Sequence, residues 1–249
     1  MKLLTKAWYQ IMQDSGLGVQ LHADDRAEVF SEALFQSLWQ KKRYDMLALR
    51  EDICYEYDMH WDEAEESRYF EENYRRELEI FQTRTPEKIL SKVADIRLLA
   101  LGYCSREVYE DLKEYRKLCR KWTEKTMEEA RRMRCAQQID KFWTEGPSLH
   151  DAVVLSLERQ GDDLYLKIEY DQDATWPEIC GIRFRGAEIL KQEGPVEKSW
   201  WLYDEVWRTE EGDLEVHGLL WRDGGVFELT VRCREAEPDW IVEPMVKPE

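Results

Sequence analysis

The chain has 249 residues, of which 43% are hydrophobic and 12% aromatic, so it is not a disordered chain even though 36% are charged. Its net charge of −17 argues against sequence-independent binding to nucleic acid or to an anionic membrane surface, because both need basic patches. The acidity fits a basic protein partner, a cation or solubility alone. We therefore expect a globular protein that binds neither nucleic acid nor a membrane.

The cysteines and the apolar runs indicate the compartment. No apolar run reaches the roughly 20 residues that cross a bilayer, and the N-terminal segment turns polar and aromatic too soon for a signal peptide. The cysteines form no CxxC pair, and several fall at apolar positions of periodic segments: Cys54, Cys104, Cys119, Cys135, Cys180 and Cys233. We interpret them as reduced thiols of a cytoplasmic protein rather than a disulfide framework or a zinc site.

The chain changes character at Glu145-Gly146-Pro147, where long helix-period stretches give way to short alternating ones. Residues 1–145 hold 25 Lys/Arg and 29 Asp/Glu, a net of −4, whereas residues 146–249 hold 11 and 24, a net of −13. We predict an α+β fold with a helical domain over 1–145 and an acidic antiparallel β domain over 146–249.

Four helices are expected before residue 103. The first covers about 6–13, and the second begins with an aspartate of 24–25 as its N-cap. A third covers about 58–82. Thr85-Pro86 marks the start of a fourth, with the threonine as N-cap and the proline in the first turn, and Gly102 marks its end.

The longest predicted helix begins at Ser105 and extends to about Phe142. Its apolar stripe recurs at spacings of four and three: Val108, Leu112, Tyr115, Cys119, Trp122, Thr126, Ala130 and Met133. We favour a long arm within a helical bundle, because the neighbouring helices carry partner stripes. The alternative is a coiled-coil seam, so the chain is expected to be a monomer or a homodimer.

After Pro147 the period of the apolar residues becomes two. Six or seven strands are predicted, at about 153–157, 164–170, 180–184, Ile189, 198–209, 214–222 and 226–234. Gly161-Asp162 and Asp223-Gly224 have the composition of tight hairpins. Consecutive strands with short turns predict an antiparallel meander, and the proline-containing tail from Glu235 is expected to be irregular.

The alternation separates a core face from a second face of the sheet. The core face carries Leu164, Leu166, Ile168, Cys180, Ile182, Phe184, Phe227, Leu229 and Val231. In residues 199–207 both faces are apolar, with Trp201, Tyr203 and Trp207 on the second face, so this strand must be covered on both sides. Either the helical half docks there, or the face is a recognition patch. The candidate binding residues are Trp201, Tyr203, Trp207, Trp221, Arg183 and His217.

His150-Asp151 is the one pair that suggests acid–base or metal chemistry, because a carboxylate beside an imidazole can orient it or share a metal. Adjacent residues of a strand point to opposite faces, so the pair converges only in the loop before the strand. Asp204 and Glu205 complete a candidate polar site. No HxH, HxxxH or HExxH pattern occurs, so we assign no metal, cofactor or catalytic residue, and we favour a buried hydrogen-bonded pair.

Four stretches together resemble a domain-of-unknown-function family found in Gram-positive bacteria of the Bacillus and Paenibacillus type. They lie at 6–9, 94–101, 149–151 and 199–205, and the Trp-Trp-Leu-Tyr-Asp-Glu sequence in the last is the most specific. The resemblance covers nearly the whole chain and implies a cytosolic bacterial protein. It assigns no activity, cofactor or catalytic residue.

Three functional hypotheses follow. The leading one is a non-enzymatic protein-binding or regulatory module, of the immunity or inhibitor kind, whose acidic β half faces a basic partner. The first alternative is a small metal-dependent or hydrolytic enzyme centred on His150 and Asp151. The second is a structural or assembly protein that dimerises through the long helix.

Overall fold

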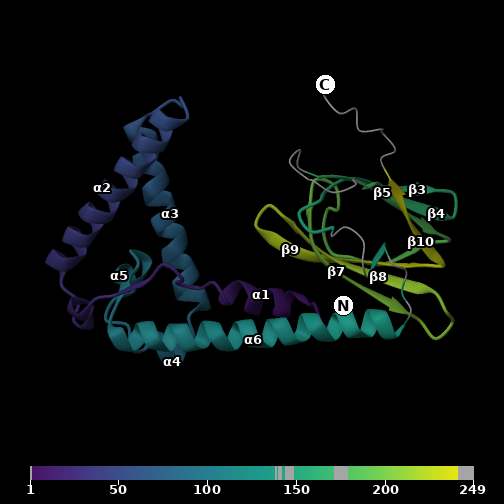
Figure 1. The fold of residues 1–249 in the computed structure, drawn as a ribbon, viewed down its shortest axis with the longest axis horizontal. Helices are drawn as coiled ribbons and strands as arrows, with labels where there is room; N and C mark the ends of the chain where they lie inside the picture. Colours follow the sequence, from purple (N-terminus) through teal and green to yellow (C-terminus); the bar gives the residue numbers. More distant parts are fainter. Residues whose placement is uncertain (1, 138, 140–141, 144–148, 171–178, 241–249) are drawn as a thin grey trace, which may run out of the picture. The chain divides into compact units, whose positions relative to one another are not determined.

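The computed structural model describes residues 2–137, 139, 142–143, 149–170 and 179–240. Helices come first and strands follow, which confirms the predicted α+β class (Figure 1). The chain forms two compact units, Met12–Lys121 on the one hand and Met1–Ile11 with Trp122–Glu249 on the other. The expected boundary at Glu145-Gly146-Pro147 lies outside the described residues, so the division at residue 145 stays a prediction.

The helical elements occupy the first part of the chain. They are α1 (Lys6–Asp14), the short 3₁₀ helix η1 (Asp25–Glu28), α2 (Glu32–Glu56), α3 (Glu63–Arg84), α4 (Glu87–Leu90), α5 (Ile96–Ala100) and α6 (Arg106–Ala136). Two-residue strands β1 (His22–Ala23) and β2 (Tyr103–Cys104) pair in parallel. None of the helices that the structure describes has both the length and the apolar character needed to cross a membrane.

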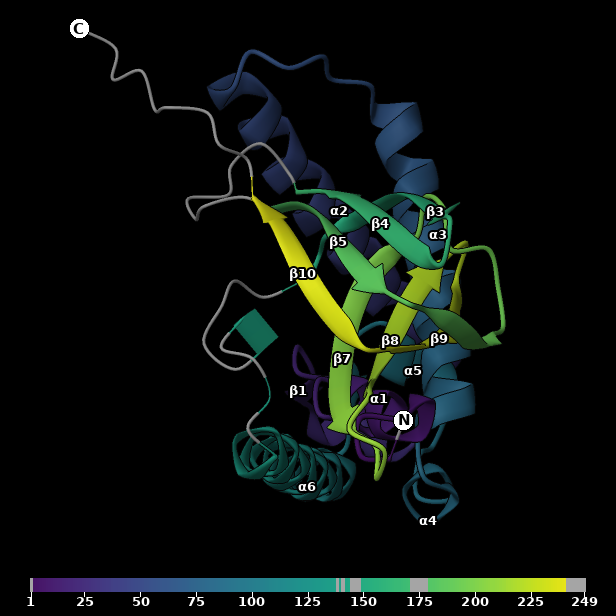
Figure 2. The same ribbon diagram turned by 90° about the vertical axis from the view of Figure 1, so that its right-hand side faces the viewer.

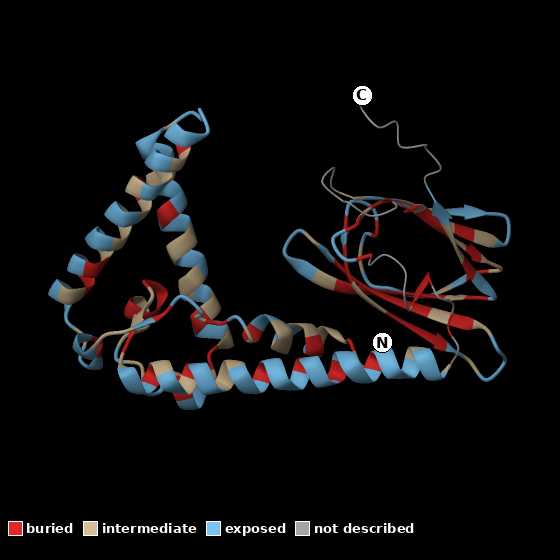
Figure 3. Cartoon of the chain, viewed as in Figure 1, coloured by how far each residue is buried: buried red, intermediate tan, exposed pale blue. Residues whose placement is uncertain are grey.

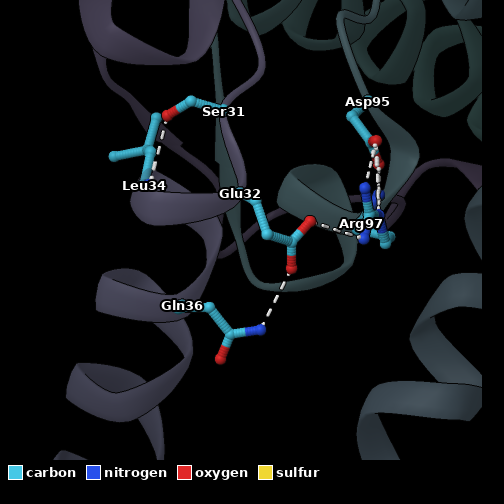
Figure 4. Close-up of polar contacts among 6 residues, drawn as sticks. All are labelled: Ser31, Glu32, Leu34, Gln36, Asp95 and Arg97. Atoms are coloured by element: carbon cyan, nitrogen blue, oxygen red, sulfur yellow. Dashed lines mark hydrogen bonds and ion pairs between the residues drawn. The ribbon is translucent and has the colours of Figure 1, made fainter.

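The start of α2 is tied to α5 through two N-caps and one arginine (Figure 4). Ser31 accepts a hydrogen bond from the backbone N–H of Leu34 at 3.2 Å, and Asp95 accepts one from the N–H of Arg97 at 2.8 Å. The Arg97 guanidinium also pairs with Asp95 at 3.0 Å and with Glu32 at 3.2 Å. The two helix starts are thereby fixed to each other as well as capped.

Two of the helix predictions were wrong in their boundaries. The helix expected from Thr85-Pro86 to Gly102 is two short helices, because Asp95 caps a new start at α5. Thr85 is the C-cap of α3 rather than an N-cap. Asp24 caps only η1, and Ser31 begins α2.

Helix α6 ends at Ala136, and much of its predicted stripe is buried within the chain. Val108 and Leu112 pack into one core cluster with Phe81 and Leu99. Trp122, by contrast, is 46% exposed. Dimerisation through α6 stays a prediction, because nothing in a single chain tests it.

Among the described residues, the β unit contains one antiparallel sheet of eight strands. They are β3 (Val153–Gln160), β4 (Asp163–Glu169), β5 (Ile179–Arg185), β6 (Glu188–Gln192), β7 (Trp200–Arg208), β8 (Leu214–Arg222), β9 (Gly225–Cys233) and β10 (Glu235–Trp240). Their order in the sheet is β10-β5-β4-β3-β7-β8-β9-β6. Two three-stranded meanders therefore meet at β3 and β7, and β6 and β10 extend the two edges.

Strand β10 lies where the tail from Glu235 was expected to be irregular, so that expectation was wrong for residues 235–240, while residues 241–249 lie outside the described ones. Pro238 pairs with Ile182 of β5 although it has no N–H to donate. Because β10 is the edge strand of the sheet, only one of its sides needs hydrogen bonds, and a proline is tolerated there.

The sheet folds over, so that β3–β5 and β7–β9 face each other across one core (Figures 1 and 2). Every residue predicted for the core face belongs to this cluster except Cys180. A register shift pairs Asp239 with Gly181 but Trp240 with Ile179, so Ile179 takes the core position. Cys180 is half-buried instead, 4.0 Å from the Tyr165 hydroxyl.

Candidate functional site

A cavity of about 480 Å³ lies beside the start of β3, within the β unit. Its walls come from the N-terminal segment, the last turns of α6, the residues before β3, and β7. We call it the His150 pocket, and its lining is Leu4, Met127, Glu128, Ala130, Arg131, Arg134, Phe142, Trp143, Leu149, His150, Leu202, Tyr203 and Asp204. Two members of the predicted polar site, His150 and Asp204, therefore share one cavity.

A half-buried ion pair between Arg134 and Asp204 forms part of the pocket wall. The guanidinium lies 3.2 Å from the Asp204 carboxylate, and it donates to the backbone carbonyls of Asp204 and Trp143. Burial raises the pKa of Asp204, while Arg134 and a hydrogen bond from Trp201 act in the opposite direction. The two charges balance each other, so this wall has no net charge to offer a ligand.

His150 and Asp151 converge as the loop alternative requires. The Nδ1 atom of His150 lies 2.9 Å from the Asp151 carboxylate, and its ring meets Tyr203 edge-on at 5.0 Å. Asp151 has a φ of +67°, so the two neighbouring side chains do not diverge as they would in a strand. The imidazole side chain is 40% exposed, so the pair lies at the surface and the expectation of a buried pair was wrong. A carboxylate-oriented imidazole can accept a proton from a bound molecule.

Glu205 takes no part in this pocket. Its carboxylate is 1% exposed and accepts from the backbone N–H groups of Lys2 and Leu3, both at 2.9 Å, and from that of Leu4. The Trp207 indole donates to it as well, at 2.8 Å. Glu205 therefore anchors the N-terminal segment to β7.

His217 is also structural in its surroundings. It pairs across the sheet with Glu205 and Thr230, and its Nδ1 lies 3.1 Å from the Thr230 hydroxyl. Glu215 lies 3.4 Å from Nε2. Burial lowers the pKa of His217, which is 7% exposed, so the neutral ring is favoured.

The predicted aromatic face does not exist as a single surface, and the placement of Trp201 on it was wrong. A β-bulge between Trp201 and Tyr203 shifts the alternation, so Trp201 enters the core beside Val206. Its ring lies so close to β8 that a Cβ on Gly218 would be 2.7 Å away, which explains the glycine at this position.

The remaining aromatic candidates are covered or scattered. Tyr203 lies on the second face, where Trp8 meets its ring at 4.8 Å, and Trp207 is 4% exposed. Residues 2–9, which belong to the predicted helical domain, contact Tyr203 and Trp207 on this face. Trp221 is 38% exposed. Arg183 lies on β5, where it donates a hydrogen bond to Gln160 at 2.7 Å. The predicted binding residues therefore do not form one patch.

The cysteines match the sequence interpretation in part. All six cysteines are free, four of them buried, and burial raises the pKa of Cys104 to about 11 and that of Cys233 to about 12. In the described ranges no three His, Cys, Asp or Glu side chains come together in a way that could hold a metal ion.

The structure also presents a surface that the sequence interpretation missed, at the turn between α2 and α3. We call residues 55–62 the hairpin tip, and Figure 3 shows this end of the two helices as exposed. Tyr55 is 91%, Tyr57 68% and Met59 52% exposed. A sequence signal was present, since three large side chains lie within five positions that follow no helical period.

The tip has a defined backbone conformation. Met59 donates its N–H to the Cys54 carbonyl at 2.8 Å, and Tyr57 donates to Ile53 at 3.1 Å. Asp58 occupies the left-handed region with φ +51°, which completes a helix C-cap of the Schellman type. The exposed side chains are therefore held on a capped turn.

The surroundings of the tip are acidic. Residues 51–66 contain no lysine or arginine. The carboxylates of Glu63 and Glu66 pair with arginines of α2. In the part of the chain that the structure describes, other exposed carboxylates here form no ion pair: Glu51, Asp52, Glu56, Asp58, Asp62 and Glu65. The tip thus combines apolar side chains with uncompensated negative charge.

Comparison with known proteins gives one family. A family model described as "Protein of unknown function (DUF4085)" matches residues 39–232, a range that includes the hairpin tip and most of the His150 pocket. No curated protein and no solved structure matches the chain.

Proposed function

Since the chain belongs to the DUF4085 family of proteins of unknown function, its role has to be inferred from its surfaces, and we propose that it is a non-enzymatic protein-binding module. The proposed binding surface is the hairpin tip, and the proposed partner is a protein with a basic patch around an apolar depression. The role is regulatory, of the immunity or inhibitor kind. We further propose that it acts in the bacterial cytoplasm, which the free cysteines support.

The observation that carries the proposal is the exposure of Tyr55, Tyr57 and Met59 on one capped turn. Single exposed apolar residues are ordinary, but a cluster of them on an ordered turn is typical of an interaction surface. Tyrosine combines a large apolar contact area with a hydroxyl that keeps a hydrogen bond, and it is enriched in binding hot spots.

The charge around the tip specifies the partner. The unpaired carboxylates beside Tyr55 and Tyr57 would repel an acidic surface and attract a basic one. They would also accelerate association at low ionic strength. Binding that weakens as salt rises is therefore part of the proposal, with the aromatic side chains supplying the contact that salt does not screen.

The test compares capture of partners by three forms of the full chain. The first is wild type, the second carries Tyr55→Ser with Tyr57→Ser, and the matched control carries Tyr44→Ser, since Tyr44 is 72% exposed on α2 itself. We expect a basic partner that binds wild type and control, is lost with the tip variant, and is released between about 50 mM and about 500 mM salt. A partner that the tip variant retains would refute the assignment of the surface.

A hydrolytic activity is the second candidate, favoured by the 2.9 Å His150–Asp151 contact at a cavity of about 480 Å³. His150 would act as the general base and Asp151 would orient its ring. Hydrolysis of p-nitrophenyl acetate or p-nitrophenyl phosphate should then disappear with His150→Ala and persist with His22→Ala, a change at an exposed histidine. Equal rates in both variants would exclude His150 as the base.

A further inference from the structure

A second cavity, of about 410 Å³, lies within the helical unit between α2, α3, α5 and residues 16–21. We call it the Lys42 pocket. Its walls are largely apolar, with Phe70, Tyr74, Phe81 and Leu99 among them. A volume of this size, with apolar walls and few polar groups, is typical of a site for a small organic molecule.

Lys42 is the basic residue of α2 that lines this cavity, and it is half-buried. Over the described ranges its ammonium makes no hydrogen bond and no ion pair. Its neighbour Lys41 differs on both counts, since it is exposed and pairs with Asp45 one turn along the helix. A charge that is partly withdrawn from water without a counter-ion is unfavourable, so an anionic ligand that pairs with the Lys42 ammonium would be stabilised.

The loop after α5 leaves room for this ammonium. Gly102 has φ +92°, and a Cβ at this position would be 3.0 Å from the Lys42 Nζ atom. Glycine suits the left-handed turn at this position, and the Lys42 ammonium lies directly beside it. Arg76 and Glu77 of α3 also line the cavity, so with Lys42 its charged side chains sum to a single positive charge, which matches a monoanion better than a multiply charged anion such as a phosphate ester.

We propose that the Lys42 pocket binds a small organic monoanion with an apolar body, such as a medium-chain or aromatic carboxylate. Lys42 would pair with the carboxylate, and Phe70, Tyr74 and Phe81 would contact the apolar body. This is a ligand site independent of the protein-binding role of the hairpin tip.

The test uses the anionic fluorophore 8-anilinonaphthalene-1-sulfonate as the probe, on the full chain. Lys42→Gln should weaken its binding on the order of tenfold or more, as expected from the loss of a charge-assisted hydrogen bond. Lys42→Arg should largely keep the affinity, and Lys41→Gln is the matched control that should not change it. Decanoate should displace the probe, and decanol should displace it poorly.

A cavity-filling change provides a second, independent readout. Asn73 lines the pocket from α3, and Asn73→Trp should abolish probe binding while leaving the far-ultraviolet circular dichroism spectrum unchanged. Equal binding by the Lys42→Gln and Lys41→Gln variants would overturn the proposal, as would retention of the probe by Asn73→Trp. The double Tyr55→Ser, Tyr57→Ser variant should bind the probe normally, so this result and that of the partner capture can fail separately.

Discussion

The Glu205 carboxylate offers the sharpest test of how the β unit is held together. In Glu205→Ala four N–H groups lose one shared acceptor: those of Lys2, Leu3, Leu4 and the Trp207 indole. Hydrogen bonds to a charged group are worth roughly 1.5–3 kcal/mol each. The backbone donors can return to water if the segment detaches, so their loss does not add in full.

Two costs then remain. Trp207 is 4% exposed, so its indole N–H stays buried without an acceptor, which destabilises the folded state by about 1–3 kcal/mol. Leu4 is also 4% exposed, and its release to water costs roughly 2 kcal/mol, partly offset by the freedom that the segment regains. We expect Glu205→Ala to lower the free energy of unfolding by about 3 kcal/mol.

Urea unfolding followed by tryptophan fluorescence measures this change, and Glu210→Ala, at an exposed position of the β7–β8 turn, is the control. The variant should also become sensitive to aminopeptidase at its N-terminus. A loss below about 0.5 kcal/mol, the range of ordinary surface substitutions, would refute the anchoring role of Glu205.

Three further predictions concern titration and thiol chemistry. Lys6 and Lys191 hold the pKa of Glu193 at about 2 instead of 4.5, so its stabilisation is present above pH 4.5 and is lost as the pH falls toward 2. Glu193→Gln should lower the free energy of unfolding by about 1 kcal/mol at pH 7, a value discounted because the side chain is 32% exposed. In urea titrations the variant should also lose less stability than wild type as the pH falls from 4.5 toward 2. Burial lowers the pKa of His217 below 6.5, so below pH 6.5 the unfolded chain takes up a proton at this histidine more readily than the folded chain does. The free energy of unfolding should therefore fall as the pH drops from about 7 to about 5, and His217→Gln should remove this dependence. With Ellman's reagent at pH 8 the native chain should show a fast thiol that disappears in Cys135→Ser, since Cys135 is exposed, and a steady fast phase in that variant would contradict the fold.

The sequence predicted the α+β class and most of the sheet core because both depend on a local period. Leu164, Leu166 and Ile182 alternate with polar residues in strands that are buried on one face, so the sequence predicted that they lie in the core. The bulge at Trp201 could not be predicted, since it inserts one residue into the alternation, so that Trp201 lies in the core while Tyr203 keeps its predicted place on the second face. The predicted binding face depended on that register.

Other features depend on tertiary context that no period reports. In the sequence, Pro238 argues against a strand. Strand β10 forms because it lies at the edge of the sheet, where a proline is tolerated. Lys41 and Lys42 are equivalent in sequence, yet one is paired at the surface and the other lines a cavity. Tyr55 and Tyr57 follow no helical stripe, which is a sequence signal, but their exposure depends on where α2 ends.

Photo-crosslinking in living cells tests the proposed function most directly. A photoreactive phenylalanine would replace Tyr57 at the hairpin tip or Tyr44 on α2, both of which are exposed in the single chain. We predict a specific crosslinked protein of basic composition at position 57 and none at position 44. Crosslinking at position 44 alone, or equally at both positions, would contradict binding through the tip.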